Sequence, residues 1–327
     1  MSVKVARAEI ESAVAAALTS SGASASNAAS VARAIATAEA SGNKVCGLYY
    51  APVFCEQMKW RKVDGQIEPA VDVDSATICV DARSGFAHPA IELGAPHLIA
   101  AASTHGIAAM AVRNSYNCLA LGYHIAPLIE RGLIGVGMSN APASVAPPGA
   151  RQPLFGTNPL AFGAPDGKGG AILVDQSLSA VTKTEMILRK NRGETIPEGW
   201  AQDGEGRATT DPAAGLAGSL LPAGGQKGAN LSLLVELLAA ALTGSRLSVA
   251  ASGFATPDGG PPGVGQFFIA IDPGHFAGEA FLSSERGLAD AFQAAHVRLP
   301  GKRRDLNGPV EVDEDLWLHV LELGAGA

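Results

Sequence analysis

The sequence offers few side chains that could bind a metal ion. Its four cysteines, Cys46, Cys55, Cys79 and Cys118, show no CxxC spacing, so neither a zinc site nor a redox pair is indicated. The seven histidines form no HxxxH or HExxH pair. We therefore expect no metal site and no metal-dependent mechanism.

The chain also has little charge and no long apolar run. Charged residues make up 17% of the 327 residues, the formal net charge is −7, and the longest basic run is Lys302-Arg303-Arg304, so nucleic-acid binding is not expected. No uninterrupted apolar run approaches the ~20 residues that a membrane span needs. The start, MSVKVARAEI, has no signal-peptide core. These features predict a cytoplasmic globular protein that binds neither nucleic acid nor membrane.

Common motifs for nucleotide binding and nucleophilic catalysis are absent as well. No GxGxxG follows a strand, no GxxxxGK[ST] is present, and no serine lies in a GxSxG elbow. The stretch 224–228 (GGQKG) has the composition of a phosphate loop, because glycines allow close backbone approach and Lys227 supplies a charge. An ordinary loop before a helix has the same composition, so anion binding stays open.

Helical periodicity alternates with short apolar runs, which indicates an α/β protein. The predicted helices cover 6–40 with a break at 20–22, 50–62, 88–104, 120–131, a stretch from about 179, 230–243 and 283–295. The predicted strands are 71–73, 76–81, 107–113, 133–139, 159–164, 171–174 and 266–271. We expect Asn230 to cap the helix that follows it, and the Gly/Pro/Asp-rich stretch 191–229 to be a long loop.

The segment 151–159 (RQPLFGTNP) combines an arginine, amides and a hydroxyl with prolines that fix the backbone path, so it predicts either a binding loop or a rigid structural loop. Its extension RQPLFGTNPLAFGAP (151–165) resembles the type-2 malate/L-lactate dehydrogenase family, which lacks a Rossmann fold. Within that family the chain is most similar to the piperideine-2-carboxylate/pyrroline-2-carboxylate reductases. The resemblance covers residues 5 to about 305 and is also carried by VRNS (112–115), ERGLIGVGMSN (130–140), LLPAGGQKGANLSLLVELLAAALTG (220–244) and RLPGKRR (298–304).

This resemblance implies the α/β fold of the type-2 malate/L-lactate dehydrogenase family, with a non-Rossmann cofactor-binding domain, in a homodimer that acts on a small-molecule substrate. We expect a helical N-terminal region over 1–65 that packs with the C-terminal part. The first part of the main α/β domain would cover 66–120 and the cofactor-binding region 121–250. The C-terminal segment, 251–327, would return to the main domain.

The resemblance further implies NADPH or NADH as the cofactor. The matching segments follow VRNS, end the strand near 175, form the GGxKG loop and form the RLPG segment. Carried over residue by residue, the cofactor-binding set is Cys118, Leu119, Ala120, Leu121, Gly122, Asp175, Gln176, Ser177, Gln226, Lys227, Arg298, Pro300, Gly301, Arg303 and Arg304.

The chain departs from the family at the catalytic turn. The family's turn reads Ser-His-Gly, with an arginine three residues after the glycine, whereas this chain has Val45, Cys46 and Tyr50 at those positions. The family's partner aspartate falls on Glu185. Histidines that the family pattern expects are also missing near 116–117 and at Pro148, Lys183 and Gln226.

Loss of the histidine affects two reductions differently. Reduction of a ketone develops negative charge on oxygen and benefits from an acid of near-neutral pKa, whereas a protonated cyclic imine is already cationic. The loss therefore favours an imine substrate. Cys46 and Glu185 would replace the usual proton-transfer pair if Lys44, or the helix that follows, lowers the pKa of the thiol. Otherwise Cys46 is a small buried side chain.

The substrate-binding residues implied by the alignment begin with Thr157, which matches the family's substrate-contacting threonine. Tyr50 cannot form the two parallel hydrogen bonds of an arginine, so either Arg151 or Lys183 holds the substrate carboxylate elsewhere, or the substrate differs. We predict an NAD(P)H-dependent reductase of a cyclic imino acid, of the pyrroline-2-carboxylate or piperideine-2-carboxylate type, or of a related 2-oxo acid. A cofactor-independent lyase or isomerase on a proline-like amino acid, with Cys46 and Glu185 as acid and base, and a non-catalytic binding protein stay open as alternatives.

Overall fold

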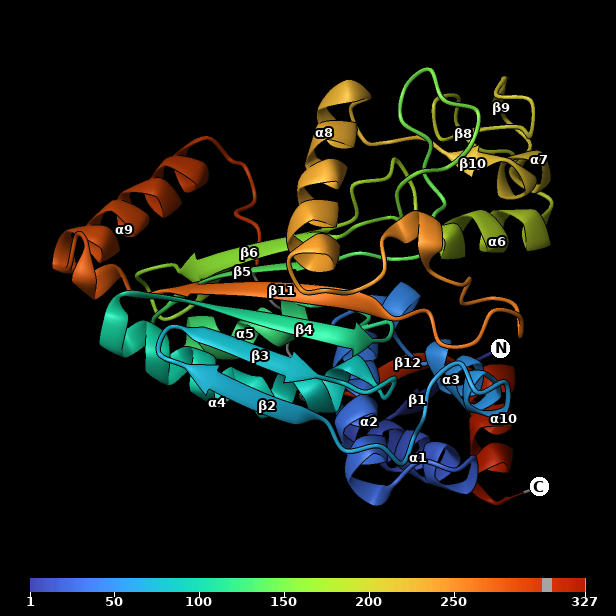
Figure 1. The fold of residues 1–327 in the computed structure, drawn as a ribbon, viewed down its shortest axis with the longest axis horizontal. Helices are drawn as coiled ribbons and strands as arrows, with labels where there is room; N and C mark the ends of the chain where they lie inside the picture. Colours follow the sequence, from blue (N-terminus) through green and yellow to red (C-terminus); the bar gives the residue numbers. More distant parts are fainter. Residues whose placement is uncertain (302–307, 327) are drawn as a thin grey trace.

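The structure, a computed structural model, describes residues 1–301 and 308–326, and a seven-stranded mixed sheet forms its centre (Figure 1). The strands lie in the order β2-β3-β4-β11-β5-β6-β7. Only β3 and β4 are parallel neighbours, and the other neighbouring pairs are antiparallel. Their bounds are β2 Ala70–Asp74, β3 Thr77–Asp81, β4 Ile107–Ser115, β11 Val264–Ile271, β5 Ile134–Ser139, β6 Leu160–Pro165 and β7 Ala171–Gln176. All seven predicted strands are confirmed within a few residues.

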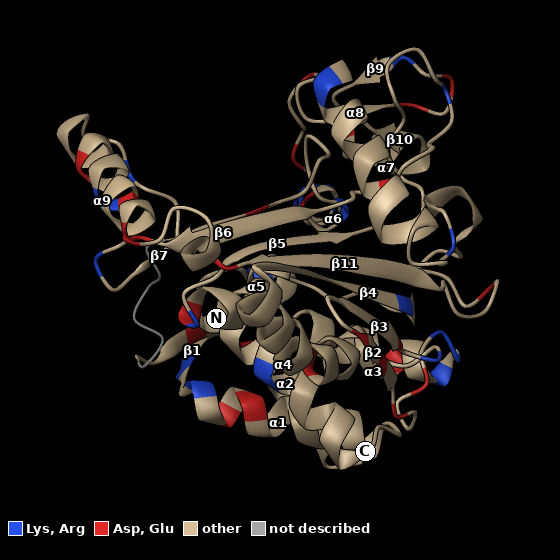
Figure 2. Ribbon diagram, turned by 60° about the vertical axis from the view of Figure 1, so that its left-hand side comes forward, with Lys and Arg blue, Asp and Glu red and all other residues tan. Residues whose placement is uncertain are grey.

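Helices α4 (Ala87–His105) and α5 (Leu121–Glu130) cover one face of this sheet (Figure 1). Buried side chains of the strands, such as Ile78 and Phe268, pack there against Leu98 and Ile125 from the helices. On the opposite face lie α8 (Gln226–Val235) and the π-helical turn η2 (Glu236–Ala241) that continues it (Figure 2). These two elements cover only part of that face.

The N-terminal region and the C-terminus form a second layer below the sheet. It contains α1 (Arg7–Ser20), α2 (Ala25–Ala40) and α3 (Tyr50–Lys59), together with α10 (Glu314–Gly324). Strand β1 (Ser2–Val5) pairs antiparallel with β12 (Val310–Asp313), which joins the two ends of the chain. This pairing was not predicted, because four-residue strands are too short to show a clear periodic pattern.

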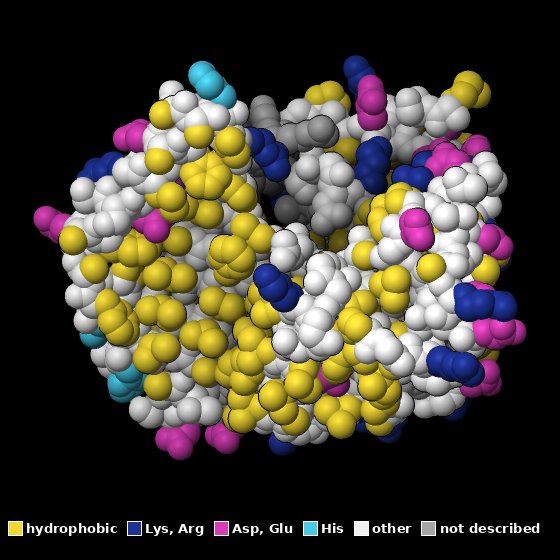
Figure 3. Space-filling model, turned by 90° about the horizontal axis from the view of Figure 1, so that it is seen from above, with side chains coloured by type: hydrophobic (Ala, Val, Ile, Leu, Met, Phe, Trp, Pro, Cys, Tyr) yellow, Lys and Arg dark blue, Asp and Glu magenta, His cyan; other side chains and the backbone are white. Residues whose placement is uncertain are grey.

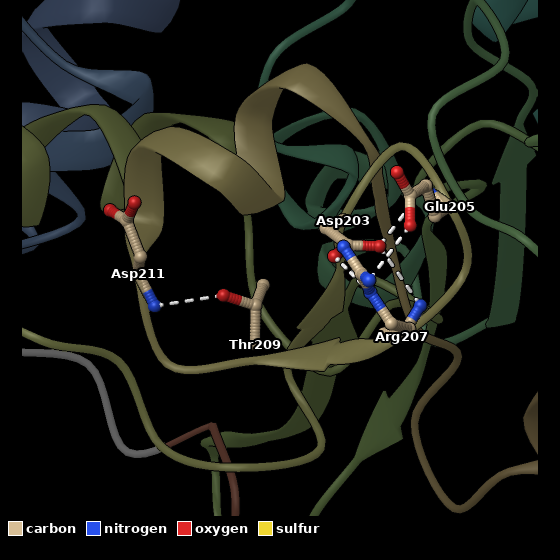
Figure 4. Close-up of polar contacts among 5 residues, drawn as sticks. All are labelled: Asp203, Glu205, Arg207, Thr209 and Asp211. Atoms are coloured by element: carbon tan, nitrogen blue, oxygen red, sulfur yellow. Dashed lines mark hydrogen bonds and ion pairs between the residues drawn. The ribbon is translucent and has the colours of Figure 1, made fainter.

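The stretch 191–229 is not the long loop that we predicted. It contains α7 (Pro212–Ala217) and a small sheet of β10 (Ser219–Leu220), β8 (Ala201–Gln202) and β9 (Ala208–Thr209). Two-residue strands carry no periodicity, which is why the pattern missed them. Arg207 pairs with Asp203 and Glu205 in the β8–β9 turn, and after β9 the Thr209 hydroxyl accepts a hydrogen bond from the Asp211 N–H (Figure 4).

Helix α8 begins four residues before the predicted start. Gly224 and Gly225 have φ angles of 67° and 63°, a conformation that suits glycine, and they turn the chain into the helix at Gln226. Asn230 is therefore not the cap that we expected: its side-chain oxygen accepts a hydrogen bond from Gln226 Nε2 at 2.9 Å.

Two more helices differ in position from the prediction. The helix expected from about 179 is α6 (Lys183–Arg192), whose first turn is capped by Thr182 Oγ1, which accepts a bond from the Glu185 N–H. Helix α9 (Glu279–Ala294) starts earlier than predicted, and it stands apart from the body of the protein beyond β6 and β7 (Figure 2). Among the described residues, no helix is long and apolar enough to cross a membrane. The cytoplasmic location stays a prediction.

Candidate active site

Segments of the predicted cofactor site meet at the end of strand β7. The Gly122 N–H, at the start of α5, donates to Asp175 Oδ2 at 2.8 Å. Two residues beyond the strand, the Leu178 N–H donates to the Thr157 carbonyl at 2.9 Å, and the Ala223 N–H donates to the Leu178 carbonyl at 2.8 Å. Four segments are therefore neighbours: the start of α5, the end of β7, the Thr157 loop and the loop before α8.

The RLPG segment lies along the outer edge of the same strand. The Leu173 N–H donates to the Pro300 carbonyl at 3.3 Å, and a Cβ on Gly301 would lie 2.4 Å from Leu173 N. Arg298 is exposed and lines a cavity of about 1400 Å³ between α9, the β6–β7 hairpin and the end of α5. Neither Cys46 nor Tyr50 lines this cavity, so it adjoins the RLPG end of the predicted site. The predicted residues Arg303 and Arg304 lie outside the described residues.

The turn that aligns with the family's catalytic turn is a 3₁₀ turn over Lys44–Cys46, and it surrounds the buried carboxylate of Glu39. Glu39 Oε2 accepts the Leu48 N–H at 2.8 Å, and a Cβ on Gly47 would come within 2.1 Å of the same oxygen. Only glycine fits at position 47 without a shift of Glu39. Lys44 Nζ lies 3.4 Å from Glu39 Oε1, so this cation is engaged by Glu39.

The Cys46 thiol consequently differs from our expectation. Burial, followed by the negative charge of Asp175, raises its pKa to about 12, and a hydrogen bond with Asn43 only partly opposes this. The acid/base role of Cys46 depended on a pKa lowered by Lys44 or the start of α3, and this condition is not met. The physical reason is that Lys44 pairs with Glu39, while the thiol lies partly buried beside a carboxylate.

Tyr50, on the first turn of α3, connects the catalytic turn to two other elements. Its hydroxyl is within hydrogen-bonding reach of Thr184, at the start of α6, and of Asn117, just after β4. Burial raises the pKa of Tyr50 most, and the neighbouring Cys46 raises it further. Thr184 and Asn117 were not among the predicted site residues. The only sequence signal for them was their position beside Lys183 and Cys118.

Tyr116 is a further residue that the sequence reasoning missed. Its ring lies 6.1 Å from that of Phe54 and 5.2 Å from that of Phe254. Its hydroxyl is buried and has no hydrogen-bond partner in the part of the chain that the structure describes. Burial raises the pKa of this hydroxyl, and Tyr50 adds to the effect. The two tyrosines therefore belong to one buried aromatic wall.

Asp175 and Lys183 are exposed side chains with reduced hydration. Both side chains can be reached by solvent, yet the surrounding protein removes much of their hydration. This raises the pKa of the Asp175 carboxyl and lowers the pKa of the Lys183 ammonium. Cys118, fully buried nearby, has a pKa raised to about 12 by burial, with the charge of Asp175 among the smaller causes.

The remaining predicted residues lie outside this group. Glu185 Oε1 accepts a bond from Arg189 Nε at 2.9 Å along α6, and this geometry lends no support to its pairing with Cys46. The side chain of Arg151 lies against Gly206 in the β8–β9 turn, where a Cβ would be 3.1 Å from Arg151 Cγ. Lys183 precedes Thr184 at the start of α6. Within the described ranges, no cluster of His, Cys, Asp and Glu is arranged to hold a metal ion.

The start of α8 is open. In the described structure no side chain caps its first turn, and a Cβ added at Gly224 or Gly225 would meet nothing within 4 Å. Gln226 and Lys227 lie exposed on that turn. Free N–H groups at a helix start, next to a lysine, favour a bound anion such as a phosphate.

Comparisons with known proteins extend over nearly the whole chain. A family model described as malate/L-lactate dehydrogenase matches residues 5–317. A (2R)-3-sulfolactate dehydrogenase (NADP(+)) of Chromohalobacter salexigens is 43% identical over 274 residues, covering 84% of this chain and 82% of the relative. A Δ1-pyrroline-2-carboxylate/Δ1-piperideine-2-carboxylate reductase of Pseudomonas putida is 39% identical over 291 residues, covering 88% and 85%.

A solved structure gives the same result for the fold. The Δ1-piperideine-2-carboxylate reductase of Pseudomonas syringae pvar. tomato superposes with a TM-score of 0.93 at 35% identity, covering 98% of this chain and 99% of that chain. The mixed sheet, the helical layer and the α/β fold class predicted from the sequence agree with this match. The chain belongs to the malate/L-lactate dehydrogenase family.

Proposed function

We propose that the protein is an NAD(P)H-dependent reductase of a cyclic imino acid, of the pyrroline-2-carboxylate or piperideine-2-carboxylate type, or of a related 2-oxo acid. The observation that carries the choice of an imine is the Cys46 thiol, whose pKa is raised to about 12. Such a group stays protonated at neutral pH and is a weak acid, so it suits a substrate whose nitrogen already carries its proton. Relatives named as reductases of these imines and as a sulfolactate dehydrogenase support both substrate classes.

The described residues fit a nicotinamide cofactor. The open start of α8, with Lys227, offers N–H groups for a phosphate. The cavity next to Arg298 and Gly301 has room for a nucleotide. When bound, NADPH or NADH supplies the hydride. The residues that would hold it are those named from the sequence at 118–122, 176–177, 226–227, 298, 300 and 301, whereas Asp175 of that set is assigned to the substrate.

The chain's own side chains bind and orient the substrate. Lys183 forms no ion pair with another described residue, and its partly desolvated ammonium holds the substrate carboxylate. Thr157 and the Tyr50 hydroxyl orient the ring, and the Asp175 carboxylate pairs with the cationic imine nitrogen. For a 2-oxo acid, the raised pKa of Asp175 suits it to hold the proton that the carbonyl oxygen accepts. Arg151, the other carboxylate partner considered, lies at the β8–β9 turn.

We also propose that two copies associate as a homodimer through the open face of the sheet. Hydrophobic side chains gather on this face, which carries α8, α9 and the strands between them (Figure 3). Phe162 on β6, Leu234 in α8, Leu237 in the π turn that continues it, and Phe276 before α9 are exposed. Contiguous apolar surface of this kind marks an interface. Light scattering that shows a single-chain mass at micromolar concentration would contradict the dimer.

The experiment starts with binding. NADPH and NADH are titrated separately by fluorescence, and the preferred cofactor is then mixed with pyrroline-2-carboxylate, piperideine-2-carboxylate or pyruvate. We expect cofactor oxidation that matches the formation of proline or pipecolate, with the imines turned over faster than the 2-oxo acid. Failure to bind either nucleotide refutes the proposal. Dehydration or epimerisation of a proline-like amino acid without cofactor consumption would establish the lyase or isomerase.

A further inference from the structure

We propose that Glu236 is a positioning residue that fixes Thr157 at the substrate site, an inference that rests on the proposed function. Glu236 is the first residue of the π turn that continues α8, and only 6% of it is exposed. It lies next to an apolar cluster that contains Val235 and Ala239. A carboxylate in such a place is costly unless hydrogen bonds satisfy both of its oxygens.

Three donors from two residues satisfy this carboxylate. Oε1 of Glu236 accepts a bond from Asn158 Nδ2 at 2.8 Å and a short bond from Ser248 Oγ. Oε2 accepts the Ser248 N–H at 3.0 Å. Hydrogen bonds to a charged group contribute more than neutral ones, so the carboxylate holds both partners firmly.

Asn158 and Ser248, the two partners of Glu236, fix the backbone on either side of Thr157. Asn158 follows Thr157, is fully buried, and has a φ of 38°, an uncommon conformation for a residue other than glycine. Ser248 Oγ accepts the N–H of Gly156, the residue before Thr157, at 3.0 Å. The backbone is therefore held on each side of Thr157 by groups that Glu236 itself holds.

Gly156 and Leu178 complete this clamp. A Cβ on Gly156 would lie 2.3 Å from the Ala141 carbonyl oxygen, so the backbone there has no room to shift. The Thr157 carbonyl accepts the Leu178 N–H at 2.9 Å, which links the clamp to the segment that follows Asp175. A single carboxylate thus connects α8, the Thr157 loop and the end of β7.

The π turn explains how Glu236 reaches these partners. A π-helical turn contains more residues than an α-helical turn, so it redirects the side chains at its start, and such turns occur often at functional sites. The turn begins at Glu236 itself and runs to Ala241.

The first test measures backbone motion and does not depend on any substrate. Hydrogen exchange is followed by mass spectrometry in wild type, Glu236→Gln and Ser248→Ala. We expect exchange at the Gly156 and Leu178 amides to be at least tenfold faster in both variants. Ser232→Ala is the matched control, because the buried Ser232 hydroxyl on the same helix has no partner among the described residues. Faster exchange confined to 226–245 in the two variants would overturn the inference.

The second test measures coupling to the substrate site. We expect Glu236→Gln, Ser248→Ala and Thr157→Ala each to lower kcat/KM for the imine by about tenfold, with NADPH affinity retained. Because Glu236 acts through Thr157, the double variant Thr157→Ala/Glu236→Gln should lose little more than either single variant. Fully additive losses would overturn the inference. If wild type reduces none of the substrates, the proposed function fails, and the exchange experiment still decides the role of Glu236.

Discussion

The reactivity of Cys46 follows directly from its surroundings and can be tested by alkylation. Burial and the charge of Asp175 raise the pKa of its thiol from 9.0 to about 12. The thiolate is the nucleophile, so each unit of pKa lowers the reactive fraction tenfold near neutral pH. The rise in pKa from 9.0 to about 12 therefore lowers the thiolate fraction about a thousandfold. We therefore expect iodoacetamide to modify Cys46 roughly a thousand times more slowly in the native protein than in the unfolded chain.

The assay uses a second thiol of the same chain as its reference. Cys79 is exposed on β3, whereas Cys55 and Cys118 are buried. Native and urea-unfolded protein are alkylated for timed intervals, and each cysteine is quantified by peptide mass spectrometry. Cys79 should react at similar rates in both states. Modification of native Cys46 within about tenfold of the rate of Cys79 would refute the reasoning.

A variant separates the two causes of the raised pKa. Burial is the larger cause and Asp175 the smaller, so Asp175→Asn should speed alkylation of Cys46 by less than the full thousandfold. A reactive thiolate in the wild type would favour the lyase or isomerase, because that chemistry needs Cys46 as a base. A protonated thiol is compatible with imine reduction.

Three further predictions concern stability and substrate binding. Burial lowers the pKa of His124 from 6.5 to about 4, so the stability that the neutral histidine allows is complete above pH 6.5 and is lost as pH falls towards 4. Urea unfolding should therefore give a free energy of unfolding that is about 3 kcal/mol smaller at the lower pH, and an unchanged midpoint would contradict this. Lys183→Gln should raise KM for the imino acid about tenfold with a smaller change in kcat, whereas Lys190→Gln, at an exposed position of the same helix, should not raise KM. An unaltered KM in Lys183→Gln would mean that another residue binds the substrate carboxylate. Gly156→Ala should lower the free energy of unfolding by about 1–3 kcal/mol, because the added Cβ would clash with Ala141. Gly287→Ala, where an added Cβ meets nothing within 4 Å, is the control, and equal unfolding midpoints for the two variants would disprove the clash.

Sequence patterns located most of the regular structure because the strands are compact apolar runs. The runs 107–113 and 133–139 became β4 and β5, and the Ser20–Gly22 break separates α1 from α2. The same reasoning failed where elements are very short, as in β8 to β10, or where conformation depends on single glycines, as at Gly225. In both cases a window of several residues contains too little periodic signal.

The segments proposed for the site were located by local sequence strings. Strings such as RQPLFGTNP and GGQKG carry local information, and the structure brings their segments together at the end of β7. The nearness of Cys46 to the negative charge of Asp175, rather than to Glu185, could not be predicted. The two residues lie on elements far apart in the sequence, and no local pattern records which carboxylate a folded chain brings to a thiol.

The sequence by itself determined the family, the α/β class and the segments that form the site, because these depend on local residue strings and hydrophobic periodicity. Tertiary structure alone decided that β11, late in the chain, lies between β4 and β5. It also decided that Lys44 pairs with Glu39 and that the Cys46 thiol remains protonated. The physical reason is that a pKa depends on the water and charges around a group, and only packing of distant segments sets those surroundings.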